Sequence, residues 1–583
     1  MLVLSALIGG LGSSSLLGCT GSSSSPSGDV DLGRGDAGPA DLGPQPADAQ
    51  RARDQGRPFP DQGPPPDGEV DLGPGGDGGG PVDGGGLADA GPADGAVADG
   101  GGGDGGGPAD ASVDGGGGDG GGPADAGADG GGGDGGGGGD GGRAADGGDG
   151  GWAPPFDPTV CGAVPHAWLP PGQTGTVIAW EELPLSGMSA EQINAILATT
   201  DFAWAAPVAY GARNFRLRYL TQDRGRLVEA TAAVGIPQGL PAGEAAAPLL
   251  WLHGTSGFND QCAPSRDPFE GAVAPTVLAA LGFIGVAPDY IGMVGFGAPS
   301  PPGTFEAYLV GEQAALGSLD ALRAAAQALT GLPGAPRAAL DQVVILGGSQ
   351  GGHAALFTER YQPYYAPELE LVGVVAAVPP TDLLGLATWA TTSWGPTAQT
   401  LPFALAAMRS WYGHPEDMTS VLVDDGPLPV ASLIDELMAT ECGFDPPDDL
   451  DTLEELYPAA VLASGSAGRW EELAPWGCYL RENSIATTSV PRVGSTPLLV
   501  TFAELDDLVY TPVMREDIPR LCAQGYQIEY LECAGLGHTR GALAALPQML
   551  TWLRQRADGE PWVPERLCEV TPARDCQPPA PEP

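Results

Sequence analysis

The sequence predicts an α/β fold in which a mostly parallel, doubly wound sheet carries an inserted helical cap. Two observations support this prediction. From residue 247 onward, short apolar runs typical of buried strands alternate with longer stretches of helical spacing, as expected for parallel strands joined by helical crossovers. The alternation stops at Pro379-Pro380 and resumes only at Thr496. We therefore expect the intervening residues to form the cap, with their large apolar side chains mostly in the cap's own core.

The front edge of the sheet precedes the alternating region. Strands are expected at residues 176–180, 215–220 and 227–234, because these runs are apolar and rich in β-branched or aromatic side chains. The last two runs are joined through Gln222-Asp-Arg-Gly225, which predicts a hairpin. Residues 189–199 have helical spacing. An antiparallel hairpin should therefore flank the parallel part of the sheet.

The alternating region supplies the remaining strands and helices. The expected strands are residues 248–252, 282–286, 343–346, 371–376, 496–502 and 527–531. The expected helices lie around residues 277–280, from 312 to 329, directly after Ser349, and from 542 to 556. Strand and helix in succession are typical of a sheet that grows in parallel.

One serine stands at a sharp break between a strand and a helix. Residues Gly347-Gly348-Ser349-Gln350-Gly351 fit the G-x-S-x-G elbow, in which a tight turn lifts a serine hydroxyl above the sheet. Glycine is needed at the first and last positions, because strand and helix approach too closely there for side chains. Short motifs recur by chance, so an unreactive serine in a glycine-rich turn is the alternative. The flanking strand and helix favour Ser349 as a nucleophile.

A serine nucleophile needs a base, and the base needs an orienting acid. Of the five histidines, His538 follows the last strand and precedes the closing helix. The acid should lie just after the strand at 496–502, where we choose Asp506, with Asp507 second and Glu504 third. The resulting chain order of serine, aspartate and histidine is that of the α/β-hydrolase fold.

The tetrahedral intermediate of acyl transfer carries negative charge on oxygen and needs preorganised hydrogen-bond donors. The backbone N–H of Gln350, next to the nucleophile, is one expected donor. The second is assigned to Thr255 in the loop His253-Gly-Thr-Ser-Gly257, with Ser256 as the alternative. An ordinary glycine-rich turn is the competing interpretation of this loop. This chemistry requires no metal or cofactor, and none is expected.

Charge and cysteine content narrow the class of protein. The 583-residue chain carries a formal net charge of −49, and all its 25 basic residues are arginine. Nothing resembles a basic patch for phosphate backbones, so nucleic-acid binding is not expected. If Cys19 is lipidated, an even number of cysteines remains, which suits disulfides in an exported domain. Their connectivity is open, and the local pair Cys568 with Cys576 is the first candidate.

Residues 1–19 are typical of an export signal. An apolar run too short to span a bilayer is followed by Leu16-Leu17-Gly18-Cys19, which resembles a bacterial lipobox. We expect an exported bacterial lipoprotein, anchored through Cys19 to a membrane at the cell envelope or surface. No arginine or lysine precedes the apolar run, which departs from the pattern. An ordinary cleaved signal with an incidental cysteine is the alternative.

Residues 20–150 repeat Gly, Asp, Ala and Pro with almost no large apolar residue. Such a segment cannot bury enough surface to offset its ordering entropy, so we expect a disordered tether, with calcium binding by its aspartates as the alternative. We expect the protein to be a monomer. The other expected parts are an α/β-hydrolase core at 151–380 and 491–560, a helical cap at 381–490, and a cysteine- and proline-containing tail at 561–583.

Several blocks of sequence carry a family resemblance. They are His253-Gly-Thr-Ser-Gly257, Cys262-Ala-Pro-Ser265, Ala287-Pro-Asp-Tyr290, Tyr308-Leu-Val-Gly311, Gly348-Ser-Gln-Gly-Gly-His353, Tyr365-Ala-Pro-Glu-Leu369 and Val378-Pro-Pro380. Together they resemble the secretory lipases of the lipase A type, which are exported α/β-hydrolases. The resemblance implies hydrolysis of carboxylic esters, often acylglycerols, and a disulfide from Cys262 into the cap. The cap itself matches by position only.

These features predict a membrane-tethered esterase or lipase that acts on lipid-like esters. Ser349 would attack the ester carbonyl, His538 would transfer the proton, and Asp506 would orient the imidazole. A peptidase or an acyltransferase could use the same three residues. A surface protein that reuses an inactive hydrolase fold is the non-catalytic alternative.

Overall fold

The computed structural model describes residues 152–199, 207–241, 243–301, 303–414, 417–442 and 450–576. The predicted export signal with Cys19, the predicted tether and the last residues of the predicted tail lie outside the described residues. Within the described ranges, no helix is both long and apolar enough to cross a membrane.

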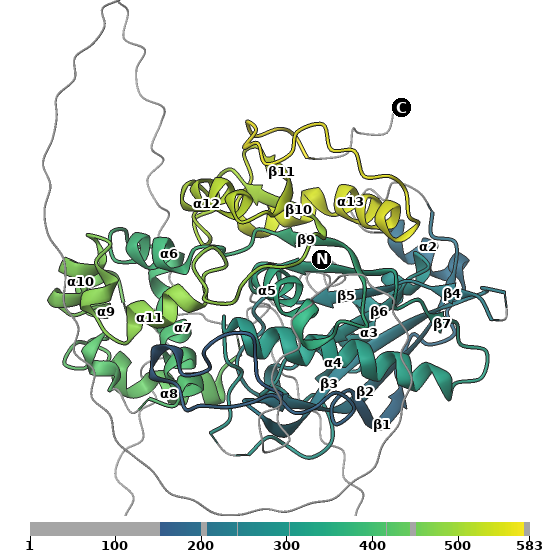
Figure 1. The fold of residues 1–583 in the computed structure, drawn as a ribbon, viewed down its shortest axis with the longest axis horizontal. Coiled ribbons are helices and arrows are strands. Elements are labelled where there is room, and N and C mark those ends of the chain that lie inside the picture. Colours follow the sequence, from purple (N-terminus) through teal and green to yellow (C-terminus); the bar gives the residue numbers. More distant parts are fainter. Residues whose placement is uncertain are drawn as a thin grey trace, which may run out of the picture. The chain divides into compact units, whose positions relative to one another are not determined.

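A nine-stranded sheet forms the centre of the fold (Figure 1). Its strand order is β1-β2-β3-β6-β5-β8-β9-β10-β11. The strands are β1 (Thr176–Glu182), β2 (Gly211–Asp223), β3 (Arg226–Gln238), β5 (Pro248–Leu252), β6 (Ile284–Pro288), β8 (Val343–Gly348), β9 (Leu371–Ala377), β10 (Pro497–Ala503) and β11 (Gln527–Cys533). A separate parallel pair is formed by β4 (Ala245–Ala246) and β7 (Arg337–Ala338).

The sheet is parallel from β6 to β11 and antiparallel at its front edge, from β1 to β6. The predicted hairpin is formed by β2 and β3. Both strands are longer than predicted, because their pairing runs from Asp223 with Arg226 as far as Gly211 with Gln238. The predicted α/β-hydrolase fold is confirmed.

Helices cover both faces of the sheet. They are α2 (Ala190–Leu197), α3 (Glu270–Ala280), α4 (Gly311–Thr330), α5 (Gln350–Tyr365), α12 (Thr511–Ala523) and α13 (His538–Ala557). Successive residues of a strand point to opposite faces. In β5, Leu250 and Leu252 therefore lie in a core with α4, α5 and α12, while Leu249 and Trp251 lie in a second core with α2, α3 and α13. This two-sided burial explains the continuous apolar runs of the central strands.

The chain between β9 and β10 forms the helical cap, drawn in green in Figure 1. Its helices are α6 (Leu383–Ala390), α7 (Pro396–Tyr412), α8 (Val430–Thr440), α9 (Leu453–Leu456), α10 (Ala459–Gly465) and α11 (Trp476–Glu482). Short 3-10 helices lie at Val160–Gly162, Asp260–Cys262, Pro264–Arg266, Met418–Ser420 and Trp470–Glu472.

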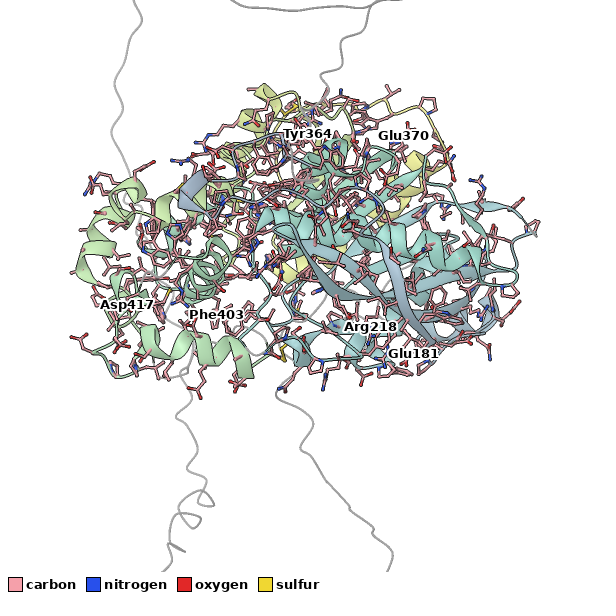
Figure 2. The ribbon with its side chains drawn as sticks, turned by 60° about the horizontal axis from the view of Figure 1, so that its bottom comes forward. Glu181, Arg218, Tyr364, Glu370, Phe403 and Asp417 are labelled. Atoms are coloured by element: carbon pink, nitrogen blue, oxygen red, sulfur yellow. A yellow bond between two sulfur atoms is a disulfide. The ribbon has the colours of Figure 1, made fainter. Side chains whose placement is uncertain are left out.

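The cap does not have a separate core, contrary to expectation. Its apolar side chains are continuous with the core that contains α4 and α5. The ring of Phe403 in α7, for example, stacks on that of Phe258 in the loop after β5, with 5.2 Å between centroids. Figure 2 shows Phe403 and Asp417 on the cap, away from Glu181 and Arg218 on the front strands. The cap is thus packed directly onto the sheet domain.

Four disulfides join the described residues: Cys161–Cys478, Cys262–Cys442, Cys522–Cys568 and Cys533–Cys576. The predicted pairing of Cys568 with Cys576 is wrong. The tail pairs with the edge strand β11 through β-bridges at Glu529 and Cys533. Its two cysteines therefore lie beside different core elements, α12 and β11. The disulfide from Cys262 into the cap is confirmed, because Cys442 follows α8.

Candidate active site

The predicted nucleophile lies in a strained turn between β8 and α5. Ser349 has φ 57° and ψ −120°, in a region that non-glycine residues rarely adopt. A Cβ atom on Gly347 would lie 1.9 Å from the carbonyl oxygen of Gly351, and one on Gly351 would lie 2.0 Å from that of Leu252. These contacts are far below van der Waals distance. The glycines of the motif are therefore required by the close approach of β8, α5 and β5.

The structure brings the predicted base to the predicted nucleophile. His538 is the first residue of α13, which follows β11 after a short loop. Its Nε2 lies 2.8 Å from Ser349 Oγ, and its Nδ1 lies 2.7 Å from Asp506 Oδ2. The side chains of His538 and Asp506 are both buried. One imidazole thus joins the serine hydroxyl to a carboxylate.

The structure also separates the three carboxylates considered for the acid. Asp506 is buried, and its Oδ1 accepts hydrogen bonds from the backbone N–H groups of Leu508, at 3.1 Å, and Val509, at 2.9 Å. Its other oxygen is left for His538. Asp507 is exposed, and Glu504 is exposed and accepts from the backbone N–H of a neighbouring loop. Of the three, Asp506 alone contacts the imidazole.

The two predicted oxyanion donors lie on adjoining segments. Gln350 is the first residue of α5, where a backbone N–H has no acceptor within its own helix. Thr255 is buried in the loop after β5, and the start of that loop packs against Gly351. The Thr255 hydroxyl donates to the Tyr308 hydroxyl, at 3.1 Å. The alternative, Ser256, is directed to the sulfur of Met293, at 4.0 Å.

An apolar pocket opens beside Ser349 between the cap and the sheet domain. Its lining includes Leu383 and Leu386 of α6, Leu401 and Ala404 of α7, and Leu480 of α11. Its volume is about 50 Å³, well below the several hundred Å³ of typical small-molecule sites. Helices α6, α7 and α11 therefore lie close to Ser349 and leave little free space beside it.

The histidines at 253, 353 and 166 contact other groups. His353 Nε2 lies 2.8 Å from the backbone oxygen of Asn483, and burial lowers the pKa of His353 to about 4. Burial likewise lowers the pKa of His253 to about 4. His166 Nε2 lies 2.9 Å from a carboxylate oxygen of Glu312. These contacts support the fold.

Two side chains at the predicted oxyanion donors were missed. Tyr308 contacts Thr255, and Glu306 accepts a hydrogen bond from the side-chain amide of Gln350. Tyr308 opens one of the family-like blocks, which was a usable signal. Glu306 precedes that block and has no signal of its own. No group of three or more metal-ligating side chains occurs within the described ranges.

Comparison with known proteins agrees with this description. The family model of the secretory lipases matches residues 273–425 and 477–565. No match was found among curated proteins.

Two solved structures illustrate the similarity of fold. The rice cell wall degrading esterase LipA from Xanthomonas oryzae matches with a TM-score of 0.52 and 20% identity, over 66% of this chain and 97% of the esterase. Lipase A from Candida antarctica in its closed state matches with a TM-score of 0.50 and 20% identity, over 70% of this chain and 88% of the lipase. At 20% identity these matches show a similar fold and nothing more.

Proposed function

We propose that this chain, which the family model of the secretory lipases matches over residues 273–425 and 477–565, is a carboxylic ester hydrolase that cleaves lipid-like esters through an acyl-enzyme on Ser349. The observation that carries the proposal is the position of His538, which lies within hydrogen-bond distance of both Ser349 Oγ and Asp506. A strained elbow, a buried acid and an imidazole between them form the arrangement that activates a serine hydroxyl.

The proposed reaction has two halves. In the first, Ser349 Oγ attacks the ester carbonyl while His538 Nε2 takes its proton and then returns it to the leaving alcohol. In the second, water attacks the acyl-enzyme with the same imidazole as base. Asp506 keeps the proton of His538 on Nδ1 and stabilises the imidazolium. The backbone N–H groups of Gln350 and Thr255 are proposed to bind the oxyanion.

We propose that the apolar pocket beside Ser349 binds the acyl group of the ester. Helices α6, α7 and α11 supply about half of its lining and the sheet domain supplies the rest, so we propose that the position of the cap controls which acyl groups fit. At about 50 Å³, the pocket can take only a short acyl group as it stands. Longer chains, such as those of acylglycerols, would require α6 and α7 to move away from the sheet domain. We therefore propose that long esters are bound only after the cap opens.

The four disulfides fit an exported protein. We propose that Cys19 is lipidated and that residues 20–150 act as the tether between the lipid anchor and the hydrolase domain. The monomeric state and the limits of the core, cap and tail are part of the same proposal. Mass analysis of the membrane fraction for a lipidated Cys19 peptide, with Cys19→Ser as the control, tests the anchor.

Hydrolysis of p-nitrophenyl esters of graded acyl length tests the reaction. The wild-type chain should hydrolyse short esters, and Ser349→Ala should lose at least about 10³-fold in kcat. Equal turnover by both proteins would overturn the serine mechanism. Preferred cleavage of peptide amides would instead indicate a peptidase. Preferred acyl transfer to an added alcohol over water would indicate an acyltransferase.

A further inference from the structure

A buried carboxyl group lies directly behind the proposed oxyanion hole. Glu306 is 2% exposed, and its Oε1 accepts a hydrogen bond from Nε2 of Gln350. Among the described residues, Glu306 Oε2 has no hydrogen-bond partner, and neither has Gln350 Oε1. The two unsatisfied oxygens therefore belong to the two side chains that already share one hydrogen bond.

This pattern favours the protonated form of Glu306. A carboxylate can only accept hydrogen bonds, so it would leave two buried acceptor oxygens unsatisfied. A neutral carboxylic acid has an O–H that can donate to the oxygen of a carboxamide. With that proton, acid and amide form a pair with two hydrogen bonds, and both buried oxygens are satisfied.

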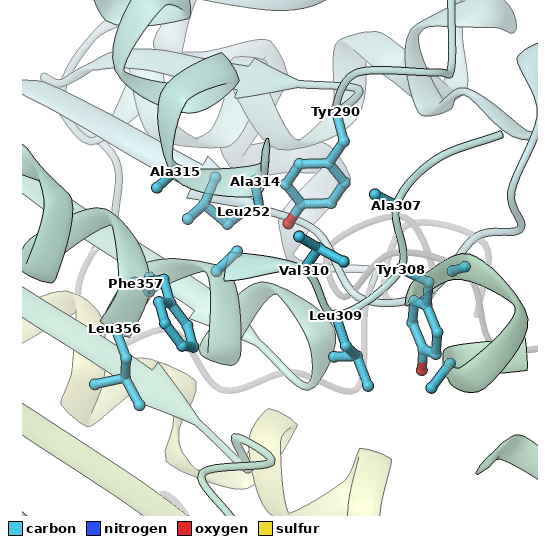
Figure 3. Close-up of a cluster of buried hydrophobic side chains, with 14 of the residues drawn as sticks. Leu252, Tyr290, Ala307, Tyr308, Leu309, Val310, Ala314, Ala315, Leu356 and Phe357 are labelled. Atoms are coloured by element: carbon cyan, nitrogen blue, oxygen red, sulfur yellow. The ribbon is translucent and has the colours of Figure 1, made fainter. Parts of the chain in front are cut away.

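The segment that contains Glu306 also holds the other proposed donor. Glu306 N–H donates to the carbonyl oxygen of Phe258, at 2.8 Å, which fixes the segment to the loop after β5. Two residues later, the Tyr308 hydroxyl accepts a hydrogen bond from Thr255. Figure 3 shows Ala307 and Tyr308 on this segment, in the same buried cluster as Tyr290. One short segment thus contacts the side chains of both proposed oxyanion donors.

We propose that Glu306 is a positioning residue of the oxyanion hole: as a neutral acid it pairs with the Gln350 carboxamide and so holds the Gln350 backbone N–H at the oxyanion. The proposal rests on Ser349 being the nucleophile. Glu306 touches neither substrate nor the reacting atoms, and it acts only through Gln350.

The surroundings of Glu306 agree with a neutral acid. Burial raises the pKa of Glu306 to about 8. The phenols of Tyr290 and Tyr308 lie nearby, and burial also raises their pKa values above the usual one, so both are uncharged. No cation contacts Glu306 in the part of the chain that the structure describes.

Glu306 also belongs to the residues around a cavity of about 630 Å³, although its carboxyl oxygens are themselves buried. The charged groups that line this cavity come from the β2–β3 hairpin and have both signs. They are Asp223, Arg224, Arg226 and Glu229.

The proposal has a definite pH dependence. Glu306 is protonated below its pKa, so the acid–amide pair is intact there and is lost as the pH rises through that value. Ionisation removes the donated proton and leaves two oxygens facing each other. It also adds negative charge close to where the oxyanion forms, which opposes the transition state. An alkaline fall in kcat should follow, with little change in KM.

The test compares two substitutions of Glu306 in the full chain, with p-nitrophenyl butyrate as substrate. Glu306→Gln replaces the acid by an amide, which can form the same two hydrogen bonds at every pH. Glu306→Leu removes both. Wild type should lose about tenfold or more in kcat between pH 7 and about pH 9.5. Glu306→Gln should lose no such factor. Glu306→Leu should have a kcat about tenfold or more below that of wild type already at pH 7, with KM within about threefold.

Glu229→Gln is the matched control, because it removes a carboxylate from the wall of the same cavity. It should keep the alkaline fall of wild type. Thermal unfolding at both pH values shows that each protein is folded when assayed. An unchanged alkaline fall in Glu306→Gln would overturn the proposal. If neither variant folds, a wild-type kcat that stays constant from pH 7 to about pH 9.5 overturns it equally. Full activity of Ser349→Ala would instead reject Ser349 as the nucleophile, which is a failure of the proposed function and not of the role of Glu306.

Discussion

The acid of the proposed triad can be tested by changing one atom. In Asp506→Asn, Oδ1 can still accept the backbone N–H groups of Leu508 and Val509, which the native carboxylate accepts at 3.1 and 2.9 Å. The new NH₂ group then replaces Oδ2, which lies 2.7 Å from His538 Nδ1. An NH₂ group is only a donor, so Nδ1 must accept. His538 is thereby forced to carry its proton on Nε2, where it can no longer take the proton of Ser349.

The size of the effect follows from this change of tautomer. A base held in the wrong tautomer costs about 10⁴-fold in kcat in serine hydrolases, which corresponds to about 5.5 kcal/mol of transition-state stabilisation. KM should change by less than about threefold, because Asp506 lies behind the imidazole and does not line the acyl pocket. Folding should be little affected, since both backbone hydrogen bonds remain.

The assay is steady-state hydrolysis of p-nitrophenyl butyrate by Asp506→Asn and by its neighbour variant Asp507→Asn. Asp507 is exposed, so its variant should keep kcat within about twofold of wild type. Thermal unfolding of both variants shows whether they are folded. A larger loss in Asp507→Asn than in Asp506→Asn would refute the assignment of the acid. Near-native activity of Asp506→Asn would refute the role of the imidazole–carboxylate contact.

Three further changes test other parts of the structure. Gly351→Ala should prevent native folding, because its Cβ would lie 2.0 Å from the Leu252 carbonyl oxygen. Gly348→Ala has nothing within 4 Å of its Cβ, so its unfolding temperature should lie within a few degrees of that of wild type. Equal unfolding temperatures of the two variants would contradict the packing of the elbow. Ala404→Leu should lower kcat/KM for octanoate esters about tenfold and leave that for acetate esters within about twofold of wild type. The exposed Ala463→Leu is the control. An equal loss for both esters would show that α7 does not select the acyl group. Burial raises the pKa of Glu306 from 4.5 to about 8, so between these pH values the folded state keeps a proton that the unfolded state loses. The free energy of unfolding of wild type should therefore fall by up to about 1.4 kcal/mol per pH unit relative to that of Glu306→Gln. The same pH dependence of this free energy in both proteins, measured by urea unfolding, would contradict the shift.

The proximity of Ser349, His538 and Asp506 was largely predictable from local sequence. The elbow around Ser349 is a steric motif, and the fold order limits the base and the acid to the loops after the last two strands. Local sequence does not determine whether Asp506 or Asp507 faces the imidazole, because no sequence pattern encodes the directions of neighbouring loop side chains. In the structure, two backbone N–H groups turn the Asp506 side chain inward.

Other features depend on contacts between distant segments. The pairing of Cys568 with Cys522, and not with Cys576, follows from the path of the tail along β11, which no local spacing encodes. The position of Glu306 behind Gln350 similarly results from the way the segment after β6 returns to the loop after β5. The front hairpin was predicted too short, because its outer residues are less apolar than its centre. The size of the apolar pocket beside Ser349 depends on how α6 and α7 pack on the sheet domain, so the substrate could not be predicted from the sequence.

The central claim is that Ser349 is the group that becomes acylated. Incubation of the full chain with a fluorophosphonate, followed by peptide mass analysis, tests it most directly. The account predicts stoichiometric modification of Ser349, with parallel loss of ester hydrolysis, and much slower labelling in Asp506→Asn. Modification of another residue, or unmodified Ser349 in an inhibited enzyme, would contradict it.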